Sequence, residues 1–215
     1  MFDRRARVLC SPVLDVFGER LVRLGVRADL VTGVGWLVGA GTCVAVGFQM
    51  WTIALLGWIV NRILDGLDGP VARRRGATDF GAYLDLVADF SIYSGFVVAL
   101  AIARPDARLA SVVLLGTYYL SGVALLSGAA LLDRRNVERS DERGVRFMGG
   151  LAEGLETIIA YVVILLAPSW AVGVEWVFAA MVLVTAVQRL MFVRRTLRDV
   201  SPADAAHPRS SNLNS

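Results

Sequence analysis

Four aspartates stand close together in a stretch of the chain that is otherwise strongly apolar. An ionised carboxylate at membrane depth is costly, so it is kept where it is paired, binds a metal or faces a polar cavity. The four form two pairs, Asp65 with Asp68 and Asp85 with Asp89, and glycines and arginines separate the pairs. This pattern indicates a binding or catalytic site.

The spacing places each pair on one face of a helix. Asp65 and Asp68 stand at i and i+3, and Asp85 and Asp89 at i and i+4, intervals that bring side chains to the same side of an α-helix. Two such helices can enclose one or two hard divalent cations with oxygen ligands only. No His or Cys lies nearby, which argues against zinc or copper. We therefore expect Mg²⁺ or Mn²⁺, as two ions.

The residues between the two pairs suit a bulky phosphorylated ligand. Gly69 and Gly81 remove side chains beside the carboxylates, which leaves room for a ligand to approach the backbone. Arg73 adds a planar donor that matches the geometry of a phosphate. Metal ligands, an arginine and small residues together describe a pyrophosphate site.

The order and spacing of these residues resemble the signature of the CDP-alcohol phosphotransferases. Members of that family are integral membrane enzymes that transfer a phosphatidyl or similar group from a CDP-linked donor to an alcohol and release CMP. The signature residues are all present in order: Asp65, Asp68, Gly69, Ala72, Arg73, Gly81, Asp85 and Asp89. The loop between Arg73 and Gly81 is one residue shorter than in the commoner members, which bears on the substrate subgroup and leaves the acidic pairs intact.

The resemblance implies a role for each signature position. Asp65, Asp68 and Asp85 would hold the metal ions across the donor pyrophosphate, with Asp89 as a further ligand. Asp89 would also act as the base that takes the proton from the acceptor hydroxyl. The donor is expected to be CDP-diacylglycerol or a similar lipid, bound by Asp68, Gly69, Ala72, Arg73, Gly81 and Asp85.

The composition of the chain is typical of a membrane protein. Its 215 residues are 56% hydrophobic, and the mean hydropathy is +0.59. These values predict a single polytopic all-α membrane protein. A nucleic-acid partner is not expected. A transporter or ion-binding membrane protein is the alternative, but it would not need glycines, an alanine and an arginine at the signature spacings.

The apolar runs predict six transmembrane helices. We expect them at about 30–50, from 51 into the aspartate motif, and at about 80–103, 109–132, 151–167 and 171–193. Residues 1–29 predict an amphipathic helix in the cytoplasmic interface, because apolar Leu14, Phe17 and Leu21 recur at helical spacing. An ordinary solvated leader is the alternative. Residues 194–215 are expected to form a polar cytoplasmic tail, which leaves 30–193 as the catalytic domain.

The arginines predict the orientation. They gather at the N-terminus, after the first acidic pair, in the loop after residue 132 and in the tail, so both termini and the motif should face the cytoplasm of an inner membrane. At about 1.5 Å per residue, Asp65 lies level with Asp89 and Asp68 with Asp85. All four then lie just beneath the cytoplasmic boundary of a core of ~30 Å.

A second polar cluster stands at the start of the fifth expected helix: Glu153, Glu156 and Thr157. It predicts either the acceptor pocket or a second layer around the metals. The alternative is that the glutamates interact with the helix dipole. Arg62 precedes Asp65 by one turn. It could offset the carboxylate charge or hold a lipid phosphate, or it could form an ion pair within the helix with Asp65.

The acceptor and the oligomeric state stay open at this level. Arginines of the 134–146 loop would suit an alcohol phosphate, whereas the glutamate pair would suit a polyol or a cationic amino alcohol. Gly35 and Gly39 allow close helix contact. Tight packing within one chain is favoured for them, and a homodimer contact is the alternative.

Overall fold

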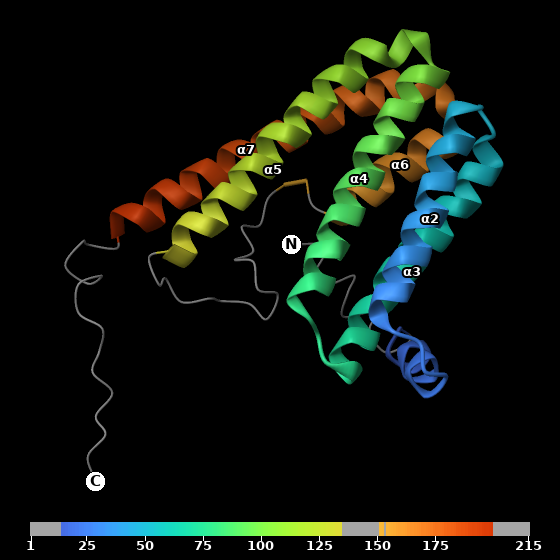
Figure 1. The fold of residues 1–215 in the computed structure, drawn as a ribbon. Helices are drawn as coiled ribbons and strands as arrows, with labels where there is room; N and C mark the ends of the chain where they lie inside the picture. The colour runs from blue at the N-terminus through green and yellow to red at the C-terminus, as the bar shows by residue number, and fades with distance from the viewer. Residues whose placement is uncertain (1–13, 135–150, 153, 200–215) are drawn as a thin grey trace. The chain divides into compact units, whose positions relative to one another are not determined.

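The computed structural model describes residues 14–134, 151–152 and 154–199. These residues are helical apart from short connections, and they contain no strand, which confirms the all-α class. A helix over 14–23 comes first. It is followed by α2 (Ala28–Gly47), α3 (Trp51–Arg75), α4 (Asp79–Ala103), α5 (Arg108–Arg134), α6 (Gly154–Leu166) and α7 (Ala171–Asp199) (Figure 1). Two 3₁₀ turns, η1 (Pro105–Ala107) and η2 (Pro168–Trp170), precede α5 and α7.

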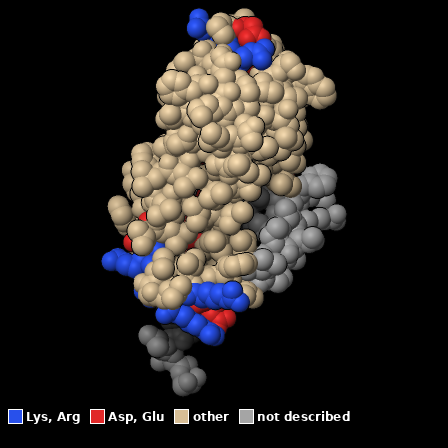
Figure 2. Space-filling model, turned by 90° about the vertical axis from the view of Figure 1, so that its right-hand side faces the viewer, with Lys and Arg blue, Asp and Glu red and all other residues tan. Residues whose placement is uncertain are grey.

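Four of the described helices are long and apolar enough to cross a membrane: α2, α4, α5 with η1, and α7 with η2. The apolar α6 has only 13 residues. The 25 residues of α3 include the acidic motif and three arginines in the last turn. Six helices thus lie where six spans were expected, but length and composition support four of them, so six spans are not confirmed. Figure 2 shows a broad uncharged area between charged groups at two ends of one face.

The chain divides into two compact units. One consists of Met1–Leu115 with Glu153–Ala179, and the other of Gly116–Ala152 with Ala180–Ser215. The acidic motif lies wholly in the first unit. In the second unit, Arg189 donates to both the carbonyl and the hydroxyl of Ser121, at 3.1 and 2.6 Å.

Within the first unit, α2 packs against both α3 and α4. Glycines on α2 make this approach possible. Asn61 of α3 donates to the Gly35 carbonyl at 2.8 Å, and a Cβ at Gly39 would lie 2.8 Å from Ile92 of α4. The predicted packing of these glycines within the chain is therefore confirmed.

Aromatic side chains fill the space between α3, α4 and α6. Trp58, Phe96 and Tyr161, one from each helix, have no exposed surface. Phe96 and Tyr161 stack at 3.9 Å between ring centroids, and Trp58 lies 5.1 Å from Tyr161. Tyr161 also donates to the carbonyl of Tyr93 at 2.8 Å. Trp58 of this core also contacts Arg62, whose central carbon lies 4.8 Å from the ring centroid.

The helix over 14–23 packs against the second half of α3. Gly18 is the buried residue of this helix, and a Cβ there would lie 2.7 Å from Cβ of Pro70. Phe17, expected on the apolar face, is 50% exposed. The contact with α3 uses the small residue, so Phe17 is left on the surface. That this helix lies in the membrane interface remains a prediction.

Candidate active site

The acidic motif lies where α3 ends and α4 begins. A short connection joins the two helices, and Thr78 caps α4 by accepting a hydrogen bond from the Gly81 amide at 3.0 Å. A capping hydroxyl fixes the first turn of a helix. The first turns of α4 therefore hold Asp85 opposite the last turns of α3.

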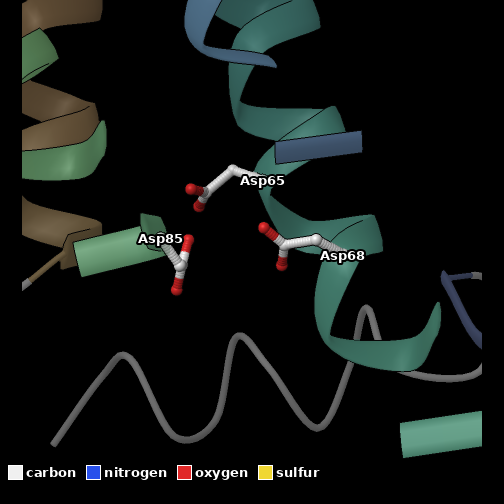
Figure 3. A group of neighbouring side chains, drawn as sticks. All are labelled: Asp65, Asp68 and Asp85. Atoms are coloured by element: carbon white, nitrogen blue, oxygen red, sulfur yellow. The ribbon is translucent and has the colours of Figure 1, made fainter. Parts of the chain in front are cut away.

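Three of the four aspartates converge. Asp65 and Asp68 project from α3 and Asp85 from α4, and their side chains point toward one another (Figure 3). One carboxylate oxygen of each lies within 4.8 Å of the others. No other such group of His, Cys, Asp or Glu occurs among residues 14–134, 151–152 and 154–199. Here Asp65, Asp68 and Asp85 are called the carboxylate trio.

The carboxylate trio fits a hard divalent cation. Its donors are all oxygens, its spacing lets them reach one ion, and its side chains are half-buried rather than sealed from solvent. Thr32 of α2 donates to Oδ2 of Asp68 at 3.0 Å, so a third helix orients one carboxylate. Oxygen-only ligation matches Mg²⁺ or Mn²⁺ and not zinc.

The fourth aspartate lies beside the trio but is not part of it. Oδ1 of Asp89 accepts a hydrogen bond from Nη1 of Arg62 at 3.1 Å. The same nitrogen lies 3.6 Å from Oδ2 of Asp65. The expected ion pair of Arg62 with Asp65 therefore occurs, but the contact with Asp89 on α4, which was not expected, is the shorter of the two. Ligation of a metal by Asp89 stays a prediction.

A small pocket adjoins these groups, between α2, α3 and α4. Charged residues, an amide, a hydroxyl and an indole line it together with a few apolar groups. The lining residues are Thr32, Gly35, Trp36, Asn61, Arg62, Asp65, Asp68, Ala88, Asp89 and Ile92. The site therefore presents carboxylates and one guanidinium to a single concave surface.

The remaining signature residues border the trio. A Cβ added at Gly69 would have one close neighbour, Nη1 of Arg73 at 3.3 Å. Ala72 is half-buried. Gly81 leaves little room, since an added Cβ would lie 3.2 Å from Asp29. Arg73 is 62% exposed and lies 3.6 Å from Asp15. Its role in binding phosphate remains a prediction.

Of the second polar cluster, the described residues Glu156 and Thr157 do not line this pocket. Glu156 is half-buried and Thr157 is buried on α6, which packs against α3. Glu153 lies outside the described residues, as do the loop arginines from Arg135 to Arg146. The acceptor role of this cluster is therefore untested.

Sequence reasoning missed three residues that hold the site together: Thr32, Asn61 and Tyr93. Each is polar within an otherwise apolar helix, which is the signal that could have found them. Asn61 and Tyr93 both accept hydrogen bonds from Arg62, at 2.7 Å each for the shortest contacts. Sequence spacing does not indicate that Tyr93 contacts Arg62, because the two residues lie on different helices.

The sequence profile of CDP-alcohol phosphatidyltransferases matches residues 26–188. The chain belongs to this family. It is therefore a membrane transferase of phospholipid biosynthesis, as the signature indicated, and the alternative of a transporter finds no support. The carboxylate trio is the part of the described chain that could bind the metal.

Two curated relatives match nearly the whole chain. The inner membrane protein YnjF of Escherichia coli (strain K12) is 32% identical over 203 residues, covering 93% of this chain and 98% of the relative. A phosphatidylinositol phosphate synthase of Streptomyces avermitilis is 29% identical, covering 96% of this chain and 88% of the relative. These matches confirm that the resemblance extends well beyond the motif.

A solved structure shares the fold. The Mycobacterium tuberculosis phosphatidylinositol phosphate synthase in complex with manganese and citrate superposes with a TM-score of 0.70 at 22% identity, covering 91% of this chain and 92% of that one. A second structure of that synthase has CDP-DAG bound. At this identity the likeness concerns the fold.

Proposed function

We propose that this protein transfers a phosphatidyl group from CDP-diacylglycerol to the hydroxyl of a small polar alcohol and releases CMP. The observation that carries the proposal is the carboxylate trio, which α3 and α4 build from the family signature. Binding of CDP-DAG by a solved structure of the same fold supports the choice of donor.

The chemistry of the transfer assigns a task to each group. The bond between the phosphatidyl phosphorus and the oxygen that leaves with CMP breaks, a bond from the acceptor oxygen to that phosphorus forms, and the acceptor proton goes to Asp89. Asp65, Asp68 and Asp85 would hold the divalent ions, which when bound neutralise charge on the pyrophosphate. Gly69 and Ala72 are small residues beside the carboxylates and would leave space for the donor headgroup.

We further propose that the site opens to the cytoplasm. The charged end of the first unit carries Arg73, Arg74 and Arg75 in the last turn of α3, directly beside the motif. An excess of arginine marks the cytoplasmic side of a membrane protein. A lipid donor could then keep its acyl chains in the bilayer while its headgroup reaches the carboxylate trio.

The acceptor is proposed to be a small alcohol or an alcohol phosphate. Two curated relatives are synthases of phosphatidylinositol phosphate and archaetidylinositol phosphate, and this supports a phosphorylated polyol as one candidate. The acidic side chain of Glu156 on α6 supports a polyol or an amino alcohol as the other candidate acceptor. Parallel assays with inositol phosphate, glycerol phosphate, inositol and serine separate the two.

The deciding experiment measures CMP. Membranes that contain the protein are supplied with CDP-diacylglycerol, one acceptor at a time and Mg²⁺ or Mn²⁺. We expect CMP and a new phospholipid in equal amounts, and we expect a chelator to remove both. Production of the phospholipid with no dependence on a divalent cation would contradict the assignment of the trio, and no CMP with any acceptor would contradict the function.

A further inference from the structure

The second half of α7 carries three polar side chains on one face. Thr185, Gln188 and Arg189 stand at i, i+3 and i+4, intervals that bring side chains to the same side of a helix. Arg189 donates to the carbonyl and the hydroxyl of Ser121 on α5, at 3.1 and 2.6 Å. This face of α7 is therefore held against α5, which gives the other two polar side chains a fixed support.

Thr185 and Gln188 hold the backbone that leads into α6. The amide of Leu151 donates to Oε1 of Gln188 at 3.1 Å, and the amide of Ala152 donates to Oγ1 of Thr185 at 2.8 Å. A backbone amide outside a helix or a sheet needs another partner, and side chains of α7 supply it here. The position from which α6 begins is therefore set by α7.

The contact at Thr185 is directional. Its hydroxyl donates to the Met181 carbonyl at 3.0 Å, one turn earlier in α7, and its oxygen accepts from the Ala152 amide. A hydroxyl has one hydrogen and two lone pairs, so the first contact leaves a lone pair free to face this amide. Thr185 has no exposed surface, and valine in its place would keep the shape while removing both hydrogen bonds.

The helix α6 has a second anchor farther along. Tyr161 donates to the carbonyl of Tyr93 on α4 at 2.8 Å, and α6 packs against α3. Glu156 lies between the two anchors, in the first turn of α6, and is half-buried. The place of its carboxylate therefore depends on the hydrogen bonds that precede it as well as on the packing that follows it.

We propose that Thr185 and Gln188 are positioning residues that fix the start of α6 and thereby place Glu156 for the acceptor alcohol. They act through the backbone and need not touch the substrate. A carboxylate binds a small polar ligand through contacts at hydrogen-bond distance, so a shift of about 1 Å in α6 weakens that binding. The role of Glu156 rests on the proposed function, whereas the hold of α7 on residues 151–152 does not.

Hydrogen exchange tests the hold of α7 without turnover. The purified full chain in detergent is placed in deuterated buffer as wild type, Thr185→Val, Gln188→Met and Thr185→Ser, and exchange at residues 151–152 is followed by mass spectrometry. Thr185→Val and Gln188→Met should each speed this exchange by roughly two- to tenfold, the range of one hydrogen bond. Thr185→Ser keeps the hydroxyl and should exchange as the wild type does. Unchanged exchange in both of the first two variants would overturn the proposal.

Kinetics test the consequence for the acceptor. CDP-diacylglycerol and Mg²⁺ are supplied with whichever of inositol phosphate, glycerol phosphate, inositol and serine gives the most CMP in the wild type. Thr185→Val and Gln188→Met should each raise the acceptor KM by roughly three- to tenfold, while the donor KM stays nearly unchanged. A purely structural role would instead lower the amount of active protein and leave the acceptor KM as it is. An unchanged acceptor KM, or an equal rise in both KM values, would contradict the proposal.

A double variant tests whether the effect passes through Glu156. Once Glu156→Gln has removed the carboxylate, its exact place matters less, so Thr185→Val should then raise the acceptor KM by less than about twofold. The same comparison applies to Gln188→Met. Increases that multiply in the double variants would show that α7 acts on the acceptor through another group and would overturn this assignment.

Thr196→Val is the matched control on the same helix. The Thr196 hydroxyl donates to the Phe192 carbonyl at 3.0 Å, which is the bond within α7 that Thr185 makes to Met181. The control should leave both the exchange at residues 151–152 and the acceptor KM unchanged. If Thr185→Val does not fold, Gln188→Met carries the test, because Gln188 is exposed. Wild-type exchange and acceptor KM in Gln188→Met would then overturn the proposal.

The two proposals can fail separately. If the wild type releases no CMP with any acceptor, the proposed function fails, yet hydrogen exchange still decides whether α7 fixes the start of α6. If CMP is released and the acceptor KM does not depend on Thr185 and Gln188, the function stands and the positioning role is wrong.

Discussion

The first unit contains two acidic sites that are built in opposite ways. The carboxylate trio gathers oxygens from two helices around a pocket, and its side chains stay partly exposed. Glu175 on α7 has no exposed surface, and both of its oxygens lie 2.9 Å from the hydroxyl of Ser111 on α5. One site leaves carboxylates open toward a ligand, whereas the other encloses a single carboxyl group within the protein.

The difference shows what distinguishes a functional acid from a structural one in a membrane helix. A buried polar group is tolerated when a partner satisfies it, as Ser111 does for Glu175. Several carboxylates gathered at one place repel one another, and they are kept together where a cation or substrate offsets the charge. The variants below test this comparison.

The largest effect is expected at the trio. Asp68→Ala or Asp85→Ala should abolish transfer while the protein still inserts, because each removes one of the three oxygens that could hold the metal. Asp106→Ala, an exposed acid near the other end of α4, is the matched control and should keep wild-type turnover. Release of CMP and binding of Mn²⁺ are the measurements. Full activity in either trio variant would rule out this metal site.

Asp89→Asn should show the next largest effect. The change keeps the size of the side chain and an oxygen for Arg62, yet it removes the basic carboxylate, so kcat should fall by roughly 10²–10⁴-fold. If the trio carries the metals, CDP-diacylglycerol should bind as in the wild type. Weak donor binding that high Mg²⁺ restores would show instead that Asp89 is an indispensable ligand.

The acidic pairs were predictable because helical spacing is local. Intervals of three and four residues place Asp65 with Asp68 and Asp85 with Asp89, and the depth count brought the two helices to one level. The trio confirms that convergence. The contact of Asp89 with Arg62 was not predictable, since the orientation of Arg62 is fixed by two rings and an amide that come from α3 and α4.

The fold was predictable to a similar degree. Helix positions follow from the apolar runs, so α3 begins at Trp51 as expected and α4 begins one residue early, at Asp79. The number of membrane crossings does not follow from the apolar runs. The helix α3 carries charged groups, and α6 is apolar but short. The site at Glu175 was not predicted, because a lone acid near the start of an apolar helix carries no pattern that indicates Ser111 as its partner.

Glu156→Gln should have a smaller effect than changes in the trio. If this half-buried side chain of α6 contacts the acceptor, the acceptor KM should rise by roughly tenfold, the value of one hydrogen bond to a charged group, while the donor KM stays nearly unchanged. Steady-state assays with each substrate varied in turn measure this. An equal rise in both KM values would place Glu156 in the support of the metal site or of the fold.

Glu175→Gln should have the smallest effect, and it completes the comparison. An amide keeps the volume, still accepts a hydrogen bond from Ser111 and supplies a donor of its own, so neither packing nor hydrogen bonding is lost. Turnover and Tm should match those of the wild type, in contrast to the loss in Asp89→Asn after the same change from acid to amide. Ser111→Ala removes the hydroxyl and leaves the buried acid without that partner, which costs about 1–3 kcal/mol and should lower Tm by roughly 2–10 °C with little change in the donor KM. A strong loss of kcat in Glu175→Gln with unchanged Tm would show that the enclosed acid takes part in the reaction, and the distinction between the two sites would then be wrong.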